Sequence, residues 1–91
     1  MKVEFDPAKR DETLAERGLD FRDAPLIIDG RFTKTVADLR FDYGEDRSVT
    51  FGWLGSLAVA VVWTEREGVR RIISMRRMHD EEIDDVGLDR P

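Results

Sequence analysis

The chain has 91 residues, with 15 Lys and Arg against 20 Asp and Glu, and its formal net charge is −5. This length predicts a single small domain over residues 1–91, and the lack of cysteine excludes a disulfide framework, a thiolate metal site and cysteine catalysis. The acidic sum also argues against nucleic-acid binding, because phosphate contacts need local positive charge.

The first third of the chain predicts a short strand and two helices. Val3-Glu4-Phe5 alternates and favours a strand. Asp6-Pro7 predicts a helix start. The Asp side chain can cap the first backbone amides, and Pro is tolerated at the first helical position because an N–H there would have no partner within the helix. This helix should run to Arg17 and end at Gly18, the residue type that most easily turns left-handed. A second short helix is expected from Phe21 to about Ile28.

The rest of the chain predicts a β-meander. Residues 31–46 lack a clear period and indicate a loop with a short strand at Phe32–Val36. Arg47–Trp53 alternates, whereas Leu57–Thr64 is apolar throughout, as in a central strand covered on both faces. Val69–Met75 predicts the third strand, and the short connections require antiparallel neighbours. The longest apolar run is far below the roughly 20 residues that span a bilayer.

The charges are unevenly distributed along the chain. Residues 66–79 carry five arginines and one glutamate, whereas residues 80–91 carry six acidic residues and one arginine. Residues 1–79 carry no formal net charge, so the net charge of the chain comes from the acidic tail, residues 80–91. The tail predicts a short helix over residues 79–86 that ends at Gly87. Nucleic-acid binding is therefore not excluded by the net charge.

The arginine cluster is the first candidate site. Strand alternation predicts that Arg71 lies on one face of its strand and that Arg70 and Arg76 share the other. A guanidinium matches phosphate oxygens in two-point fashion, so several on one sheet can hold an RNA backbone and stabilise charge on a phosphorane. The alternative is an ordinary surface on which these arginines pair with carboxylates.

Other polar residues are weaker candidates. His79 is the only imidazole and is a candidate acid or base, although it has no partner at a recognisable spacing. Asp80–Asp85 lacks a calcium-loop pattern and favours a solvated helix end or a contact surface for a basic partner over a metal site. Trp53 and Trp63 lie in predicted strands and are interpreted as core. The sequence has no phosphate loop, catalytic-triad order or nucleophile elbow, so P-loop NTPases, zinc hydrolases and serine hydrolases are unsupported.

Six segments, taken in order and with their spacing, are similar to one known family. They are Lys2–Lys9, Gly18–Phe21, Ala24–Asp29, Tyr43–Gly52, Thr64–Arg66 and Arg71–Arg77. Together they resemble the BrnT toxin family, whose corresponding strand ends in Arg-Ile-Ile-Ser-Ala-Arg. The resemblance covers nearly the whole chain, from residue 2 to residue 82.

The resemblance implies an α+β fold, a RelE-like small domain with two N-terminal helices packed on a small antiparallel β-sheet and a short C-terminal helix. It implies the toxin of a bacterial type II toxin–antitoxin system, a cytoplasmic endoribonuclease that inhibits translation. Cleavage would proceed by attack of the ribose 2′-OH on the adjacent phosphate, with no metal and no organic cofactor. The expected partner is a BrnA-like ribbon-helix-helix antitoxin, and promoter DNA would be bound only through the antitoxin complex. We expect no signal peptide and no membrane contact.

The resemblance also implies roles for individual residues. Arg66 and Arg71 match basic positions of the family and are the candidate catalytic phosphate clamp, while Glu45 is the candidate general base. His79 remains a second candidate acid or base. The candidate RNA-binding residues, taken from the family positions and the arginine cluster, are Lys9, Arg47, Arg70, Arg76 and Arg77.

Two non-enzymatic alternatives stay open. One is a fold relative that has lost cleavage and acts as the antitoxin-binding subunit of a DNA-binding autorepressor complex. The other is an interaction module whose acidic tail docks a basic partner. Glu16-Arg17-Gly18 stands where the family usually has Lys-His-Gly, and the acidic residues 80–86 stand where its last helix is usually basic. The acidic tail would then bind the antitoxin or compete with RNA for the arginines.

Overall fold

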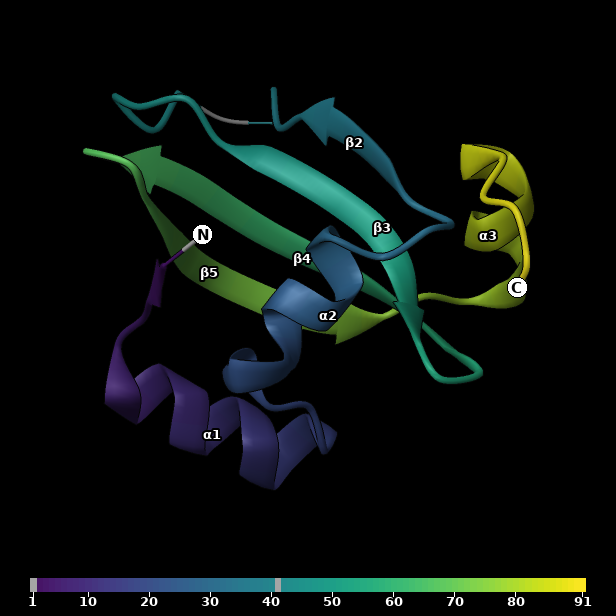
Figure 1. The fold of residues 1–91 in the computed structure, drawn as a ribbon, viewed down its shortest axis with the longest axis horizontal. Helices are drawn as coiled ribbons and strands as arrows, with labels where there is room; N and C mark the ends of the chain where they lie inside the picture. The colour runs from purple at the N-terminus through teal and green to yellow at the C-terminus, as the bar shows by residue number, and fades with distance from the viewer. Residues whose placement is uncertain (1, 41) are drawn as a thin grey trace.

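The computed structural model describes residues 2–40 and 42–91, which contain a five-stranded sheet and helices on both of its faces (Figure 1). The predicted α+β class is confirmed. The strand order in the sheet is β1-β5-β4-β3-β2. The strands are Val3–Glu4 (β1), Lys34–Ala37 (β2), Ser48–Leu54 (β3), Leu57–Arg66 (β4) and Val69–Arg77 (β5). The helices are Pro7–Arg17 (α1), the 3₁₀ turn Phe21–Asp23 (η1), Ala24–Ile28 (α2) and Asp80–Val86 (α3).

The predicted meander is confirmed, because β3, β4 and β5 pair in sequence and antiparallel. β2 begins two residues later than predicted and pairs antiparallel with β3. The expectation of a wholly antiparallel sheet is wrong, because β1 pairs with β5 in parallel at the opposite edge. Parallel neighbours need a long connection, and residues 5–68 separate these two strands.

The first helix forms as the local sequence predicts. The Asp6 side chain accepts a hydrogen bond from the Ala8 N–H at 2.9 Å, and Gly18 ends α1 with a φ of 69°. Yet α1 contributes no buried residue, whereas α2 contributes Ala24 and Ile27 to the core. The predicted packing of both N-terminal helices on the sheet is therefore not confirmed. α1 is poor in apolar residues, so it borders the sheet instead of covering it.

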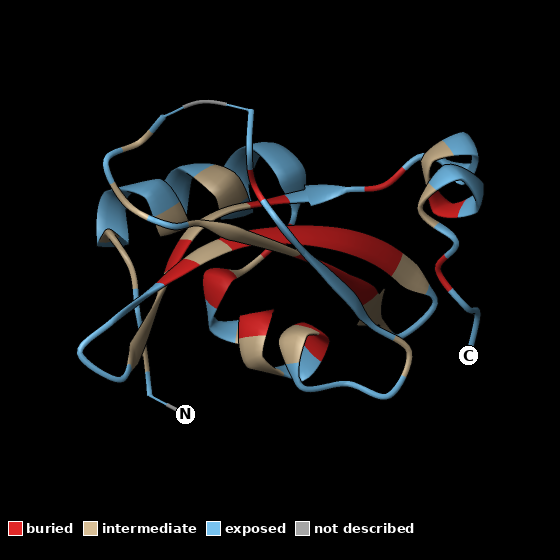
Figure 2. Ribbon diagram, turned by 90° about the horizontal axis from the view of Figure 1, so that it is seen from above, coloured by how far each residue is buried: buried red, intermediate tan, exposed pale blue. Residues whose placement is uncertain are grey.

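The sheet has a hydrophobic core on each face, as predicted for a central strand covered on both sides. Figure 2 shows the buried residues concentrated along the middle of the sheet. The core on the side of α2 consists of Leu19, Phe21, Ala24, Ile27, Val59, Val61, Ile72 and Met75. The core on the side of α3 consists of Phe51, Ala58, Ala60, Met78, Ile83 and Leu88. The two faces are called below the α2 face and the α3 face.

A β-bulge in β5 decides which face each arginine occupies. Ser74 pairs with Val62 and Ile72 pairs with Trp63, so Ile73 is the extra residue of the bulge. Because side chains alternate along a strand, one extra residue reverses the alternation beyond it.

The bulge separates two arginines that simple alternation places together. Arg70 lies on the α2 face, where its Nη1 is 2.8 Å from Asp29 at the end of α2. Arg76 lies on the α3 face, where it binds Glu82 of α3. The prediction that Arg70 and Arg76 share a face is therefore wrong, and Arg71 shares the α3 face with Arg76 instead.

The acidic tail is part of the fold. α3 starts one residue later than predicted and ends, as predicted, at Gly87 with a φ of 74°. Ile83 and Leu88 are buried in the core of the α3 face. The chain beyond α3 is also bound, because the Trp53 Nε1 donates to the Asp89 carbonyl at 2.9 Å. In the part of the chain that the structure describes, no helix has the length and apolar character needed to cross a membrane.

Candidate functional site

The basic side chains predicted from the sequence divide between the two faces of the sheet. Strand alternation and the bulge place four of the six predicted site arginines on the α3 face. We call this surface the arginine face, and its members are Arg40, Arg47, Arg66, Arg71 and Arg76. The structure thus brings Arg47, Arg66, Arg71 and Arg76 to one surface, as a shared RNA-binding site requires.

Glu45 connects two of these arginines at one end of the face. Arg66 Nε and Nη2 donate to Glu45 Oε2 at 3.1 Å and 2.8 Å, and Arg47 Nη2 donates to Glu45 Oε1 at 3.3 Å. The hydrogen bonds from Arg66 hold the pKa of Glu45 below its usual value, against a smaller opposing effect of desolvation. Glu45 is therefore an anion at neutral pH, and a poor proton acceptor while Arg66 remains bound to it.

Arg71 lies beside Arg66 on the same face. Arg71 pairs with Thr64 across β4 and β5, so Arg66 is its diagonal neighbour. Diagonal neighbours in an antiparallel pair lie roughly 7–8 Å apart, within reach of long side chains. The Arg71 Nη1 is 3.6 Å from the Glu4 carboxylate, a loose contact that leaves this side chain 31% exposed. Arg66 and Arg71 are therefore close enough to bind the same phosphodiester group.

Arg76 lies farther along the same face, roughly 15 Å from Arg71 along β5. Its Nη1 and Nη2 donate to the two carboxylate oxygens of Glu82 at 2.7 Å and 2.6 Å. This two-point contact raises the pKa of Arg76 and lowers that of Glu82. The acidic helix thus supplies the partner of one candidate RNA-binding arginine.

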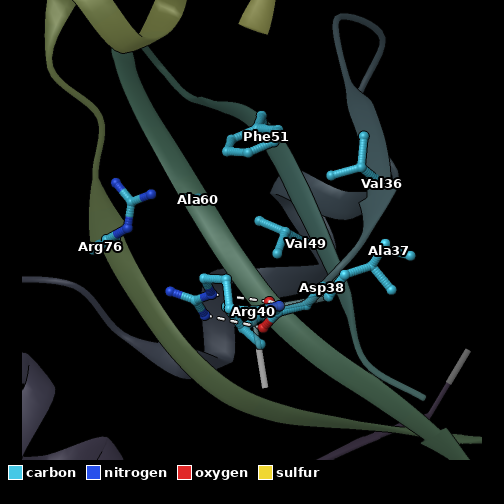
Figure 3. A pocket seen from close by; sticks show the side chains of 10 residues that line it. Val36, Ala37, Asp38, Arg40, Val49, Phe51, Ala60 and Arg76 are labelled. Carbon is cyan, nitrogen blue, oxygen red and sulfur yellow. Dashed lines mark hydrogen bonds and ion pairs between the residues drawn. The ribbon is translucent and has the colours of Figure 1, made fainter. Parts of the chain in front are cut away.

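A pocket of about 380 Å³ opens on the arginine face (Figure 3). Its wall is mainly apolar and includes Val49, Phe51 and Ala60 from β3 and β4. Arg40 and Arg76 stand on its rim, on the far side of the sheet from α2. At this pocket, apolar surface and exposed guanidinium groups meet.

Sequence reasoning missed the group that positions Arg40. Asp38, with a side chain only 1% exposed, accepts hydrogen bonds from Arg40 Nε and Nη2, both at 2.9 Å. The Tyr43 hydroxyl donates to the same carboxylate at 3.2 Å. The bonds from Arg40 lower the pKa of Asp38 to about 2. These residues lie in residues 31–46, where hydrophobic and polar residues do not alternate regularly, so the sequence pattern gave no indication of their contacts.

The remaining predicted residues lie outside the arginine face. Arg70 is only 15% exposed, with its guanidinium 5.2 Å from the centre of the Trp63 ring. Arg77 and His79 line a second pocket of about 530 Å³ beside Arg76 and the end of α1. Lys9 is exposed on α1. The structure does not bring Lys9, Arg70, Arg77 or His79 together with Arg66 and Glu45.

Both tryptophans are partly buried and pack against the two cores from within their strands, so they border the predicted core without being fully part of it. Trp63 packs against the core of the α2 face and donates its Nε1–H to Thr50 Oγ1 at 2.9 Å. Trp53 packs against the core of the α3 face. Among the described residues, no group of three or more His, Asp or Glu side chains is arranged to hold a metal ion.

The fold and the site define a small α+β protein with an arginine-rich sheet face, a surface chemistry suited to phosphodiester groups. Residues 5–82 match the family of BrnT, described as the ribonuclease toxin of a type II toxin–antitoxin system. The chain belongs to this family, which confirms the resemblance read from its sequence. A comparison with curated proteins gives no match.

Proposed function

We propose that this protein cleaves RNA as the toxin of its toxin–antitoxin pair and that the arginine face holds the RNA. The observation that carries the proposal is the placement of Arg66 and Arg71 as diagonal neighbours, with Arg47 joined to Arg66 through Glu45. Three guanidinium groups at one end of an open sheet can bind successive phosphates and balance the charge that develops at one of them.

In the proposed reaction the ribose 2′-OH gives its proton to a base and attacks the adjacent phosphate, and no metal is needed. The bond from phosphorus to the 5′ oxygen breaks, which leaves a 2′,3′-cyclic phosphate on one fragment and a 5′-OH, protonated from water, on the other. Arg66 and Arg71 clamp the phosphate and stabilise the added negative charge. The incoming phosphate replaces Glu45 as the partner of Arg66. Losing those hydrogen bonds returns the pKa of Glu45 toward its usual value, so that it becomes a better base for the 2′-OH. His79 could act only on a group held near Arg76 and Arg77.

The proposed partner is a BrnA-like ribbon-helix-helix antitoxin that covers the toxin and, with it, represses their promoter. Cleavage of messenger RNA would inhibit translation in the cytoplasm. The RelE-like relation of the fold is part of the same proposal, and the five-stranded sheet with its open arginine face supports it.

Induced expression in a bacterial host tests this function. The wild type should stop growth and fragment messenger RNA, and the Arg66→Ala/Arg71→Ala double variant should do neither. Arg22→Ala/Arg31→Ala is the matched control, because it removes the same charge from exposed positions outside the arginine face. Normal growth with folded, soluble wild type would contradict the proposal.

A second candidate function is an inactive subunit of the antitoxin repressor complex. It is favoured by the ion pairs of two candidate RNA-binding arginines, because Arg66 is already bound to Glu45 and Arg76 to Glu82. This candidate replaces the first if the wild type leaves RNA intact but binds the antitoxin and raises the antitoxin's affinity for promoter DNA in a gel-shift assay.

A further inference from the structure

The pocket on the arginine face has a feature that backbone binding does not require. Phosphate contacts need exposed cations, yet the pocket wall is formed by Val36, Val49, Phe51, Ala60 and Val62 from three neighbouring strands. Its volume of about 380 Å³ lies within the range of sites that enclose small organic groups, roughly 300–1,000 Å³. Figure 3 shows Phe51, Val49 and Val36 grouped on one side of the pocket, with Arg76 on the opposite side and Arg40 below Val49.

The two cations on the rim are held in place and remain accessible. Asp38 holds Arg40 from the buried side, and Glu82 holds Arg76 from α3. Their side chains are still 61% and 44% exposed, respectively. The charge of Arg40 disfavours the charge of Arg76, a small effect on the pKa of Arg76 that the hydrogen bonds with Glu82 outweigh. An anion placed between them would relieve that repulsion.

We propose that this pocket binds one unstacked nucleobase of the RNA, while Arg76 binds the phosphate attached to the same nucleotide. The inference rests on the proposed function and deepens it by assigning a base-binding subsite. A nucleobase has apolar faces that gain from burial against Val49 and Phe51, and its nucleotide carries a phosphate that can lie between the two rim arginines. The phosphate takes the place of Glu82 on Arg76.

A nucleotide fits these observations better than an apolar side chain of a protein partner. Such a side chain would fill the apolar wall but would leave Arg40 and Arg76 without an anion between them. A nucleotide uses both parts of the site at once. Because Arg71 and Arg76 lie on the same face of β5, the bound base would be a few nucleotides from a phosphate held by Arg66 and Arg71.

The test measures binding apart from cleavage. The probe is a fluorescein-labelled, single-stranded 2′-O-methyl oligonucleotide of mixed sequence, which lacks the attacking hydroxyl, together with versions carrying an abasic residue at each position in turn. Val49→Phe fills the pocket. Leu26→Phe is the matched control, because Leu26 is 65% exposed on α2 and lies on the other side of the sheet. Cleavage of unmodified RNA is followed in parallel.

With the wild type, an abasic residue at one position should weaken binding about tenfold, the effect of losing one stacked base. Val49→Phe should bind the intact probe about tenfold more weakly and show no dependence on the abasic position, whereas Leu26→Phe should resemble the wild type. If circular dichroism shows that Val49→Phe is unfolded, Phe51→Leu, which removes the flat ring, takes its place in the same comparison.

Three outcomes overturn the inference. Val49→Phe could match the wild type throughout while RNA is bound and cleaved, which leaves the proposed function intact. Val49→Phe could lose affinity for the antitoxin alone, which assigns the pocket to a protein partner. The wild type could neither bind nor cleave RNA, in which case the proposed function fails as well.

Discussion

The role of each arginine depends on the carboxylate that it meets. Glu45 binds Arg66 from 21 residues away, and Asp29 binds Arg70 from 41 residues away. Arginine was recognisable in the sequence as a phosphate-binding residue type, but its partner was not, because these pairs join distant segments. The partners make Arg70 a half-buried link to α2 and leave Arg66 on an open surface.

Glu45 offers a test at the level of one residue. Glu45→Gln removes the charge that competes with RNA for Arg66, so RNA should bind about two- to threefold more tightly. If Glu45 is also the base, the cleavage rate should fall about 100-fold or more. Binding is measured with the uncleavable oligonucleotide and cleavage by single-turnover kinetics. Tighter binding with an unchanged cleavage rate would show that Glu45 only positions Arg66.

Two carboxylates should make the protein acid-sensitive. Arg40 lowers the pKa of Asp38, and Arg10 lowers that of Asp20, in each case from 3.8 to about 2. Because the folded state binds these protons less readily than the unfolded state, the stabilisation is complete above about pH 4 and is lost as the pH falls toward 2.

Urea unfolding at several pH values measures this loss. Asp38→Asn should lower the unfolding free energy at neutral pH. Between about pH 4 and pH 2, the unfolding free energy of this variant should also change less steeply with pH than that of the wild type. Arg40 is the partner that the asparagine would no longer neutralise. An unchanged slope in the variant would contradict the role assigned to Asp38.

At the level of elements, the position of α2 and the course of β5 both depend on single residues. Gly52 in β3 allows α2 to approach closely, because a Cβ there would lie 2.9 Å from Ile27 Cγ2 and 3.0 Å from the Ile27 carbonyl oxygen. The bulge at Ile73 lets Ile72 and Met75, three residues apart, both enter the core of the α2 face. The same bulge sends Arg71 and Arg76 to the α3 face.

Deleting Ile73 should therefore leave the core in place. Ile72, Ser74 and Met75 would then alternate regularly, so that Ile72 and Met75 both stay on the α2 face. The deletion should cost less than about 3 kcal/mol in unfolding free energy, the loss expected for a disrupted core. Ile73→Ala, which keeps the residue count, is the control for the loss of this half-buried side chain. Urea unfolding followed by tryptophan fluorescence compares them, and an unfolded deletion variant beside a stable Ile73→Ala would argue against the bulge.

At the level of the whole molecule, charge is organised across the sheet and α3. The acidic helix is anchored by Ile83 and Leu88, while Glu82 reaches back to Arg76. Removing residues 80–91 would therefore expose the core of the α3 face as well as free Arg76. A test of competition between the tail and RNA has to change one side chain and keep the helix.

Glu82→Gln is the appropriate change. It weakens the contact with Arg76 and should tighten RNA binding by up to about fivefold at low salt, with a smaller effect at high salt. Glu81→Gln is the matched control, because it removes the same charge from an exposed position on the same helix. Equal affinities of the two variants, measured by fluorescence anisotropy, would show that Glu82 does not compete with RNA.

Most of the fold could be predicted because its elements carry local signals. Asp6 and Gly18 bound the first helix, and Gly87 ends the last. The antiparallel meander follows from its short connections. The parallel pairing of β1 with β5 could not be predicted, because strand partners far apart in sequence leave no local pattern. The residue types of the candidate site were predicted, but the predicted division of Arg70, Arg71 and Arg76 between the two faces was wrong, because strand alternation alone does not reveal a bulge.

The sequence by itself determined the family, through segments spread along the chain. It also determined the ends of the first and last helices, the meander and the separation of an arginine segment from an acidic tail, because each of these depends on residues close together along the chain. Only the tertiary structure decided which arginines share a surface and where α3 rests. The physical reason is that one bulged residue reverses side-chain direction and that ion pairs form between segments which meet only after folding. The acidic tail is thus both part of the core and the partner of Arg76.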